Sequence, residues 1–191
     1  TDRGFDNAVR CQQVFGGHGY IAEWGMEQFV RDARIAQIYE GANGIQALDL
    51  VGRKLPKDGG RAVMAFFAEV GEFLKVNKDD ADLAPFTKSL KAGLDQLQQA
   101  TMWFMQNGMA KPDNAGAGSN DYMHLFGLVA MSYMWARIAK VALTKKDDPA
   151  MASKLKVGRF YVDRIMPECA TRLAGVVAGA DSLMALDADA F

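Results

Sequence analysis

Cysteine is scarce in this sequence, with two residues among 191. Neither Cys11 nor Cys169 belongs to a Cys-x-x-Cys pair or stands beside a histidine. The spacing therefore argues against a disulfide framework and against a cysteine-based zinc motif. We expect two reduced, buried thiols, which indicate a reducing compartment, the cytoplasm.

An excess of charge of either sign is also missing. The chain has 22 lysines and arginines, 23 aspartates and glutamates, and a formal net charge of -1. This balance gives no broad positive field and so disfavours nucleic acid as the partner. The most apolar stretch, residues 125–143, is interrupted by Arg137 and Lys140. A membrane span, which needs about 20 predominantly apolar residues, is therefore not expected.

The first residues lack an initiating methionine and the basic and apolar regions of a secretory signal. The sequence thus predicts a chain that begins inside a longer protein.

Alternation of apolar and polar residues with a period of two is missing over any length that would predict a strand. Apolar residues instead recur at intervals of three and four, as in Val63, Phe66, Phe67 and Val70. This spacing places them on one face of a helix. We predict an all-α protein, a helical bundle.

The predicted helices form two groups, separated at residues 56–60 by a proline and two glycines. We place the first domain at residues 1–58 and the second at residues 59–191. The first contains helices over about 2–15, 25–37 and 42–55, with a glycine-rich turn at 16–19. The second contains antiparallel helices over about 61–78, 84–107, 120–146 and 150–186, joined by polar loops of which 111–120 is the longest.

The first domain has a glycine-rich stretch where helix packing does not need one. Residues 13–20 read Gln-Val-Phe-Gly-Gly-His-Gly-Tyr. A glutamine followed by two glycines can present a side-chain amide and open backbone N–H groups to a phosphate or a purine. Alone, the stretch is more typical of a helix C-cap and turn.

A second stretch carries a candidate base. Glu40 follows the apolar and aromatic pair Ile38-Tyr39 and precedes Gly41-Ala42-Asn43-Gly44. A carboxylate held against an apolar cavity loses hydration and becomes a stronger base, and glycine lets a ligand approach the backbone closely. By spacing alone, Glu40 is more typical of a surface residue in a turn between helices.

Together, over residues 5–55, these stretches resemble the carboxy-terminal helical domain of acyl-CoA dehydrogenases. The resemblance also includes Glu23, Glu27 and the segment Arg31-Asp32-Ala33-Arg34. It implies an FAD cofactor, whose pyrophosphate and adenosine end is contacted from a neighbouring subunit by the glutamine and second glycine of the motif. The residues that the resemblance assigns to this contact are Gln13 and Gly17, and Gly16 between them is also expected to bind the cofactor.

The same resemblance places Glu40 on the family's catalytic glutamate and Tyr39 and Gly41 beside the acyl thioester. Ala42, Asn43 and Gly44 are assigned to the flavin through their backbone, because Gly44 has no side chain where the family often carries an acid or amide. Arg53 stands one position away from an arginine that some members use for CoA, so it receives no role.

The resemblance implies a reaction as well. Glu40 takes a proton from the carbon α to the thioester while the β carbon gives a hydride to the flavin, and a trans-2-enoyl-CoA forms, as in fatty acid β-oxidation. The implied partners are an acyl-CoA substrate, an electron-transfer flavoprotein, and further copies of the chain in a homodimer or homotetramer. Residues 60–191 resemble the extra carboxy-terminal domain of a long bacterial subfamily that includes enzymes acting on 3-methylthiopropanoyl-CoA.

Two other functions stay open. The chain is either part of such a dehydrogenase or a helical assembly module in which Glu40 has no catalytic role. An acyl-CoA oxidase, in which oxygen reaches the reduced flavin, shares the same helices and base. No metal site is expected, because His18 and His124 stand far apart in the sequence. We expect this portion of the enzyme to be inactive alone.

Overall fold

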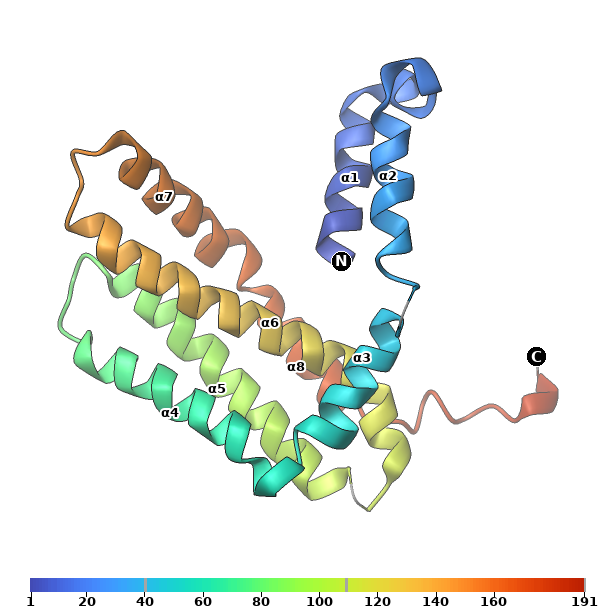
Figure 1. The fold of residues 1–191 in the computed structure, drawn as a ribbon. Coiled ribbons are helices and arrows are strands. Elements are labelled where there is room, and N and C mark those ends of the chain that lie inside the picture. The colour runs from blue at the N-terminus through green and yellow to red at the C-terminus, as the bar shows by residue number, and fades with distance from the viewer. Residues whose placement is uncertain (40, 109, 191) are drawn as a thin grey trace. The chain divides into compact units, whose positions relative to one another are not determined.

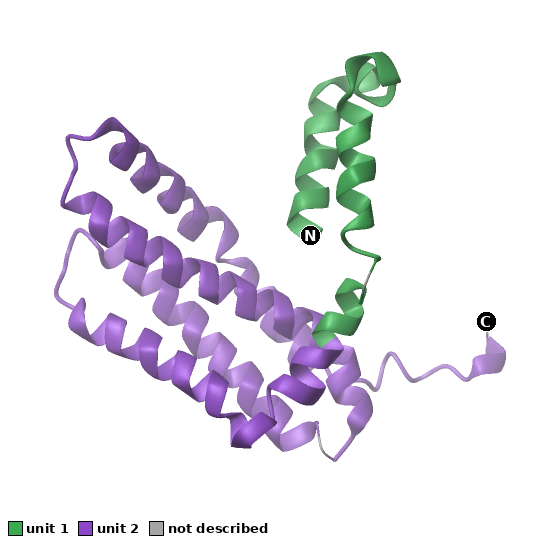
Figure 2. Ribbon diagram, in the orientation of Figure 1, with its two compact units in different colours: residues 1–47 green, residues 48–191 purple. Residues whose placement is uncertain are grey.

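The structure is a computed structural model that describes residues 1–39, 41–108 and 110–190. The regular elements within these ranges are all helical and include no strand, which confirms the predicted all-α class. The chain forms two compact units, which Figures 1 and 2 show: residues 1–47, called here the hairpin unit, and residues 48–191, called the bundle unit.

The hairpin unit is built on two antiparallel helices, α1 (Asp2–Val14) and α2 (Met26–Ile35) (Figure 1). The 3-10 helices η1 (Gly16–Tyr20) and η2 (Ala22–Trp24) connect them. Helix α3 (Asn43–Asp49) begins in this unit and continues past its last residue. Neither α1 nor α2, both described over their full length, has a buried residue. Two helices that bury an apolar stripe only against each other thus leave most of that stripe exposed.

The absence of a buried face on α1 corrects one prediction. Cys11 lies on α1 and is exposed, whereas Cys169 is buried in the bundle unit. The expectation of two buried thiols therefore holds for Cys169 and is wrong for Cys11.

Over its described residues, the bundle unit contains four helices that follow one another side by side and a fifth that closes the core (Figure 1). They are α4 (Arg61–Val76), α5 (Ala84–Asn107), α6 (Pro112–Leu143), α7 (Pro149–Phe160) and α8 (Glu168–Val177). Short segments join or flank them: the π-helices η3 (Leu50–Lys54) and η5 (Tyr161–Ile165), and the 3-10 helices η4 (Lys57–Gly60) and η6 (Ala188–Ala190).

The core of the bundle unit lies where α5, α6 and α8 meet. Leu90 and Leu97 of α5, Leu125 and Val129 of α6, and Val176 of α8 are all fully buried. Burying each of these side chains stabilises the fold by about 1.5 to 3 kcal/mol relative to leaving it in water. The unit thus has an apolar core of its own, in contrast to the helices of the hairpin.

One polar pair is sealed inside this core. Tyr122 of α6 is fully buried, and its hydroxyl lies 2.8 Å from Thr101 Oγ1 on α5. Because Thr101 Oγ1 donates to the carbonyl of Leu97 at 2.8 Å, the proton between the two hydroxyls comes from Tyr122. Burial raises the pKa of Tyr122 to about 12.

The predicted loop at residues 111–120 is wrong, because α6 begins at Pro112. Glycine and asparagine weaken a helix, glycine by about 1 kcal/mol, but here packing outweighs propensity. Gly118 is buried, and a Cβ added to it would lie 2.9 Å from Phe104 Cζ and 3.3 Å from Val176 Cα. The glycine thus lets α6 approach α5 and α8 closely, a contact that local propensity does not reveal.

The predicted single helix over 150–186 is also wrong. Three pieces, α7, η5 and α8, replace it, and α8 ends at Val177. The π-helical turn closes with a hydrogen bond from the Met166 N–H to the Tyr161 carbonyl at 3.1 Å, and Pro167, which follows, has no N–H to continue an α-helix. Gly179, with φ of +69°, stands just after the end of α8, where glycine is favoured.

Helix α6 is longer than the predicted 120–146 segment and reaches 32 residues. By length and composition alone it could cross a membrane, although 44% of its most apolar window is buried inside this unit. It packs against α5, α7 and α8, as the central helix of a bundle does. Its apolar side chains therefore contribute to the core of the bundle unit.

The boundary between the compact units falls at 47/48, before the predicted domain boundary at 58/59. The reason is that η3, which follows α3 directly, packs against α6 and so joins the bundle unit.

Candidate functional site

The glycine-rich stretch forms the tip of the hairpin. Gly16 adopts φ of +59°, and the buried Gly19 brings the chain back against the end of α1. Gln12 Nε2 donates to the Gly19 carbonyl at 3.1 Å. A Cβ on Gly19 would lie 2.5 Å from the Gln12 carbonyl oxygen, so this turn requires glycine at position 19. The sequence pattern did not indicate a role for Gln12, whose side-chain amide stabilises the turn through this hydrogen bond.

The three residues predicted to contact the cofactor from the tip lie on its surface. Gln13, Gly16 and Gly17 are all exposed in the hairpin unit. A Cβ placed on Gly16 or Gly17 would meet no heavy atom within 4 Å. Their backbone is therefore open to a ligand or to another polypeptide.

An aromatic cluster stands beside these glycines. The ring of Trp24 makes edge contacts with His18, at a centroid distance of 5.1 Å, and with Phe15, at 6.4 Å. His18 thus packs against an indole ring at the tip, which gives the turn an aromatic side.

The residues predicted for catalysis lie in the connection from α2 to α3, which we call the base loop (residues 37–43). The carboxylate of Asp2, from the start of α1, closes this loop. Asp2 Oδ1 accepts from Gln37 Nε2 at 2.6 Å and from Asn43 Nδ2 at 2.5 Å. The Asn43 N–H donates to the Gln37 carbonyl at 3.2 Å, and Thr1 Oγ1 donates to Asn43 Oδ1 at 2.9 Å.

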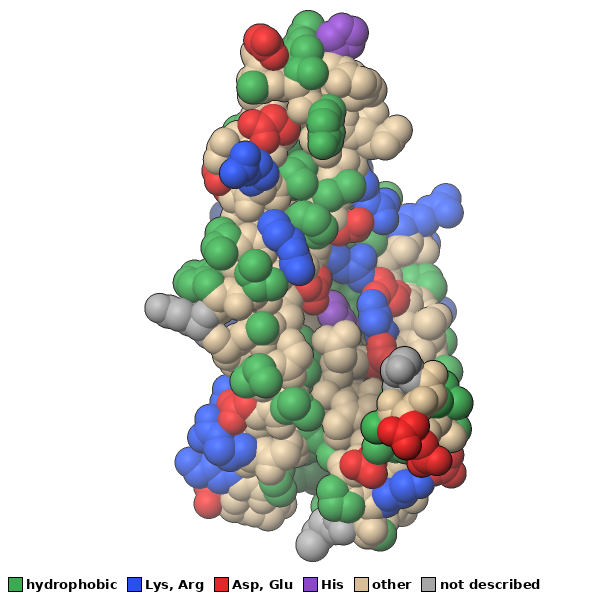
Figure 3. All heavy atoms as spheres, turned by 90° about the vertical axis from the view of Figure 1, so that its right-hand side faces the viewer, with side chains coloured by type: hydrophobic (Ala, Val, Ile, Leu, Met, Phe, Trp, Pro, Cys, Tyr) green, Lys and Arg blue, Asp and Glu red, His purple; other side chains and the backbone are tan. Residues whose placement is uncertain are grey.

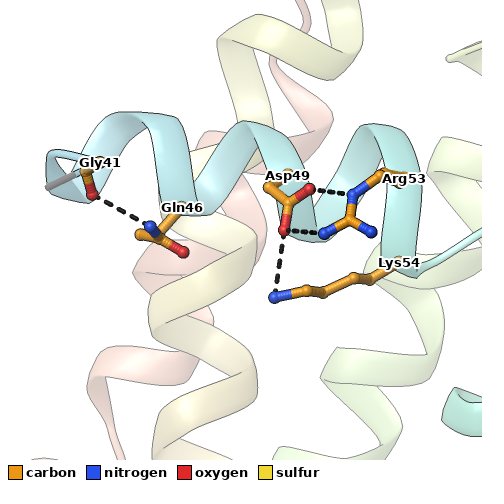
Figure 4. A network of polar contacts seen from close by, with 5 residues as sticks. All are labelled: Gly41, Gln46, Asp49, Arg53 and Lys54. Carbon is orange, nitrogen blue, oxygen red and sulfur yellow. Dashed lines mark hydrogen bonds and ion pairs between the residues drawn. The ribbon is translucent and has the colours of Figure 1, made fainter.

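Gly41 has a conformation that favours glycine, with φ of +77°. Gln46 Nε2 donates to its carbonyl at 3.1 Å, as Figure 4 shows. The carbonyl of Ala42 then accepts from the N–H groups of Ile45 at 2.8 Å and Gln46 at 3.1 Å, which begins helix α3. Side-chain and backbone contacts together therefore fix the exit of the base loop.

Glu40, the predicted base, lies outside the described residues. Its neighbours in sequence are described: Tyr39 is 55% exposed in this unit, Gly41 and Gly44 are exposed, and Ala42 and Asn43 are half-buried. The Asn43 side-chain amide already makes hydrogen bonds to Asp2 and Thr1, so a ligand would have to bind other atoms of Asn43. Gly44 has no heavy atom within 4 Å of an added Cβ, so no side chain covers its backbone there.

The structure separates the two sets of predicted site residues. Gln13 stands at the end of α1, whereas Asp2, which holds the base loop, stands at its start. Since α1 has 13 residues, these ends are roughly 20 Å apart at 1.5 Å per residue. The hairpin unit therefore presents the glycine tip and the base loop as two distinct sites.

Arg53, which the resemblance left without a role, belongs to an ion-pair cluster in the bundle unit. Both Arg53 and Lys54 contact the carboxylate of Asp49, Lys54 at 3.1 Å (Figure 4). Hydrogen bonds from Arg53 and Lys54 lower the pKa of Asp49 to about 2. The cluster is exposed to solvent, so its contribution to stability is small.

Large apolar side chains lie exposed along the hairpin unit, and Figure 3 shows hydrophobic side chains interspersed with polar and charged ones on one face of the molecule. Val14 is 86% exposed, Tyr20 80% and Phe29 65%. Contiguous exposed apolar area is typical of surfaces that bind other polypeptides, membranes or ligands. Within the described ranges, no three His, Cys, Asp or Glu side chains come together to hold a metal ion.

Comparison with known proteins shows that both parts of the chain match models of protein families. Residues 1–55 match the family model for the "Acyl-CoA dehydrogenase, C-terminal domain", and residues 66–187 match the model described as "Acetyl-CoA dehydrogenase C-terminal like". The hairpin with its base loop, followed by a helical bundle, is thus a C-terminal helical region, and the chain belongs to the acyl-CoA dehydrogenase family.

The relatives narrow this assignment. The chain is 33% identical to the 3-methylmercaptopropionyl-CoA dehydrogenase of Ruegeria pomeroyi, over 96% of the chain and 32% of that protein. It is 24% identical to the broad-specificity linear acyl-CoA dehydrogenase FadE5 of Mycobacterium tuberculosis, over 100% of the chain and 33% of that protein. The predicted long subfamily with an extra C-terminal domain is therefore confirmed.

A third relative matches a shorter part of the chain. The probable acyl-CoA dehydrogenase fadE25 of Mycobacterium leprae is 59% identical over 46 residues, which are 24% of the chain and 12% of that protein. The chain spans about a third of the length of the two relatives that it matches throughout.

Proposed function

We propose that this chain is the carboxy-terminal part of a flavin-dependent acyl-CoA dehydrogenase that introduces a double bond between the α and β carbons of an acyl-CoA thioester. One observation carries the proposal: a single domain match over residues 1–55 includes both the glycine tip and the base loop. The names of the relatives support the same reaction class.

In this proposal Glu40 is the base that removes the α proton of the acyl-CoA. Tyr39 and Gly41, its neighbours, lie beside the acyl thioester. The α C–H is a weak acid, so its removal requires a carboxylate that is shielded from water and a polarised thioester carbonyl. Among the described residues on either side of position 40, the side chains of Gln37 and Asn43 donate hydrogen bonds to Asp2, and the Gly41 carbonyl accepts one from Gln46.

The exposed residues fit FAD as the cofactor. Gly16 and Gly17 expose backbone that no side chain blocks, Gln13 exposes an amide beside them, and Gly44 is open at the start of α3. An open backbone and an amide suit a pyrophosphate and an adenosine. When bound, FAD supplies the acceptor for the hydride that leaves the β carbon.

The separation of the glycine tip from the base loop favours an oligomer. In a homodimer or homotetramer the tip of one subunit, with Gln13 and Gly17, contacts the cofactor whose substrate faces the base loop of another. The exposed apolar side chains of the hairpin unit support such packing. We further propose that an electron-transfer flavoprotein reoxidises the reduced cofactor.

The test is anaerobic mixing of the full-length flavoprotein with a panel of acyl-CoA thioesters that includes 3-methylthiopropanoyl-CoA. We expect at least one thioester to bleach the flavin and to yield the corresponding 2-enoyl-CoA. Bound flavin that no thioester bleaches would contradict the proposal and favour an assembly module. Rapid reoxidation of the reduced flavin by oxygen would identify an acyl-CoA oxidase instead.

A further inference from the structure

We propose that residues 182–190, called here the tail segment, dock into a basic apolar groove on the bundle unit of a second copy of the chain. Both the tail segment and the groove belong to the bundle unit. Neither includes a residue proposed for catalysis or for cofactor binding. The inference therefore goes beyond the proposed reaction and assigns a self-association surface that is separate from the hairpin unit.

The groove lies over the second half of α6, between α4 and α7, and has a volume of about 730 Å³. Its apolar lining comes from all three helices: Phe73, Met134, Ile138, Val141 and Met151. Met134, Ile138 and Val141 follow one another at intervals of four and three residues, so they form a stripe on one face of α6. These three side chains are 38, 39 and 56% exposed. An exposed apolar stripe in a groove is typical of a surface that binds a partner or a ligand.

The rim of the groove is basic. Arg137, Lys140 and Lys154 line it, and its described lining residues include no aspartate or glutamate. Arg137 Cζ lies 5.5 Å from the centroid of the Tyr133 ring, and Lys140 Nζ lies 5.9 Å from that of Phe73. Over the part of the chain that the structure describes, none of the three cations forms an ion pair. The groove therefore suits a partner that is both apolar and acidic.

The tail segment has this complementary composition. Its large apolar side chains are Leu183, Met184 and Leu186, which are 67, 62 and 61% exposed. Asp187 and Asp189 follow them and are exposed as well, without an ion-pair partner among residues 1–39, 41–108 and 110–190. Residues 173–191 contain no lysine or arginine. An acidic apolar segment and a basic apolar groove thus lie on the same chain.

The tail segment is too short to fill the groove of its own subunit. The Ala180 N–H donates to Asn114 Oδ1 at 3.0 Å, which fixes the start of the tail beside the start of α6 (Figure 1). Ile138, in the middle of the groove, stands 24 positions after Asn114 on the same helix, which is about 36 Å at 1.5 Å per residue. The chain from Ala180 to Leu186 spans about 22 Å at most when fully extended. The occupant must therefore come from a second copy.

A reciprocal exchange closes the assembly. When the tail segment of each copy enters the groove of the other, the two contacts are equivalent and a two-fold dimer forms without open ends. In each contact three apolar side chains leave water, and two carboxylates face three cations. The apolar burial supplies the affinity, and the opposite charges fix the orientation.

The experiment uses the full-length protein with the photoreactive amino acid p-benzoylphenylalanine in place of Leu186, which keeps this position large and apolar. After irradiation, a denaturing gel separates single subunits from cross-linked pairs, and mass spectrometry of the digested protein locates the attached residue. The matched control carries the same photoreactive group in place of Met102, which is 54% exposed on α5 and does not line the groove.

The opposite charges are tested by reversal in the protein that carries the photoreactive group at position 186. The groove reversal is Lys140→Glu with Lys154→Glu, and the tail reversal is Asp187→Lys with Asp189→Lys. A third protein combines both reversals and so restores opposite charges in exchanged positions.

A further pair of substitutions controls for the change in net charge. Lys88→Glu with Lys156→Glu reverses two exposed lysines of α5 and α7 that do not line the groove. This control changes the net charge as much as the groove reversal does.

We expect the photoreactive group at position 186 to join two subunits through a residue of the groove, and the group at position 102 to leave the groove unlabelled. The groove reversal and the tail reversal should each lower the yield of cross-linked pairs about threefold. The combined reversal should return the yield to within about twofold of the parent protein, and the control reversal should stay within the same range.

The proposal is overturned if the photoreactive group at position 186 attaches only within its own subunit, for example to the hollow that Leu183 and Met184 border beside the start of α6, or only outside the groove of a second copy. It is also overturned if the control reversal lowers the yield as much as the groove reversal, or if the combined reversal stays as low as either one alone. Bleaching of the flavin by acyl-CoA is a separate readout: its absence would contradict the proposed reaction and would leave the outcome of the cross-linking unchanged.

Discussion

Replacing Thr101 with valine should destabilise the bundle more than replacing its partner Tyr122 with phenylalanine, although both changes break the same hydrogen bond. The tyrosine hydroxyl is fully buried and lies 2.8 Å from Thr101 Oγ1. In Thr101→Val it stays buried without this acceptor, which costs about 1 to 3 kcal/mol. In Tyr122→Phe the threonine hydroxyl still donates to the Leu97 carbonyl, so the loss should be about 0.5 to 1.5 kcal/mol.

The double variant sharpens this prediction. With both hydroxyls removed no polar group is left unpaired, so the double variant should be more stable than Thr101→Val alone and should deviate from additivity by about 1 kcal/mol. The assay is urea unfolding of the chain followed by far-ultraviolet circular dichroism, with the four proteins compared at equal concentration. The reasoning would be refuted if the losses in the free energy of unfolding of the two single variants added up to that of the double variant to within about 0.4 kcal/mol. It would also be refuted if Thr101→Val were more stable than Tyr122→Phe.

Three further outcomes are expected. The raised pKa of Tyr122, about 12 in the folded chain against 10.0 when unperturbed, means that stability is fully present below pH 10 and falls as the pH rises towards 12. The loss is about 2 to 3 kcal/mol and should be missing from Tyr122→Phe in unfolding curves at alkaline pH. Cys11 is exposed while burial raises the pKa of Cys169 to about 11, so a thiol reagent should modify one cysteine in the native chain and the second only after unfolding; two fast reactions would contradict the burial of Cys169. Gly118→Ala should lower the melting temperature because its Cβ meets side-chain and backbone atoms, whereas Gly116→Ala on the same helix meets none and should raise it; equal shifts would refute the close packing at Gly118.

The sequence predicted the fold best where a regular apolar pattern coincides with packing. Helix α5 runs over 84–107 as predicted, and Phe86, Leu90, Leu94 and Leu97, spaced at three and four, are all buried. The prediction of a loop at residues 112–120 was wrong, because the buried Gly118 lies within helix α6 and allows this helix to pack closely against its neighbours. Propensity alone cannot report such a contact, since the partner atoms come from two other helices.

The candidate site was predictable only in part, for a similar reason. The motif around Gln13 and Gly17 and the stretch around Glu40 are local in sequence, so pattern reasoning finds them. The contact between Asp2 and Asn43 joins residues 41 positions apart, so no local sequence pattern predicts it. Gln12 was overlooked beside Gln13 because only the folded turn shows which of the two amides reaches Gly19.

The central claim is that Glu40 is the base of an acyl-CoA dehydrogenase. The most direct measurement is anaerobic flavin reduction by a saturating acyl-CoA in full-length Glu40→Gln, beside the parent protein. Glutamine preserves the shape of the side chain and removes its basicity, so the variant should keep its flavin and its affinity for acyl-CoA and should show no bleaching. Bleaching at the parent rate would remove Glu40 from the mechanism.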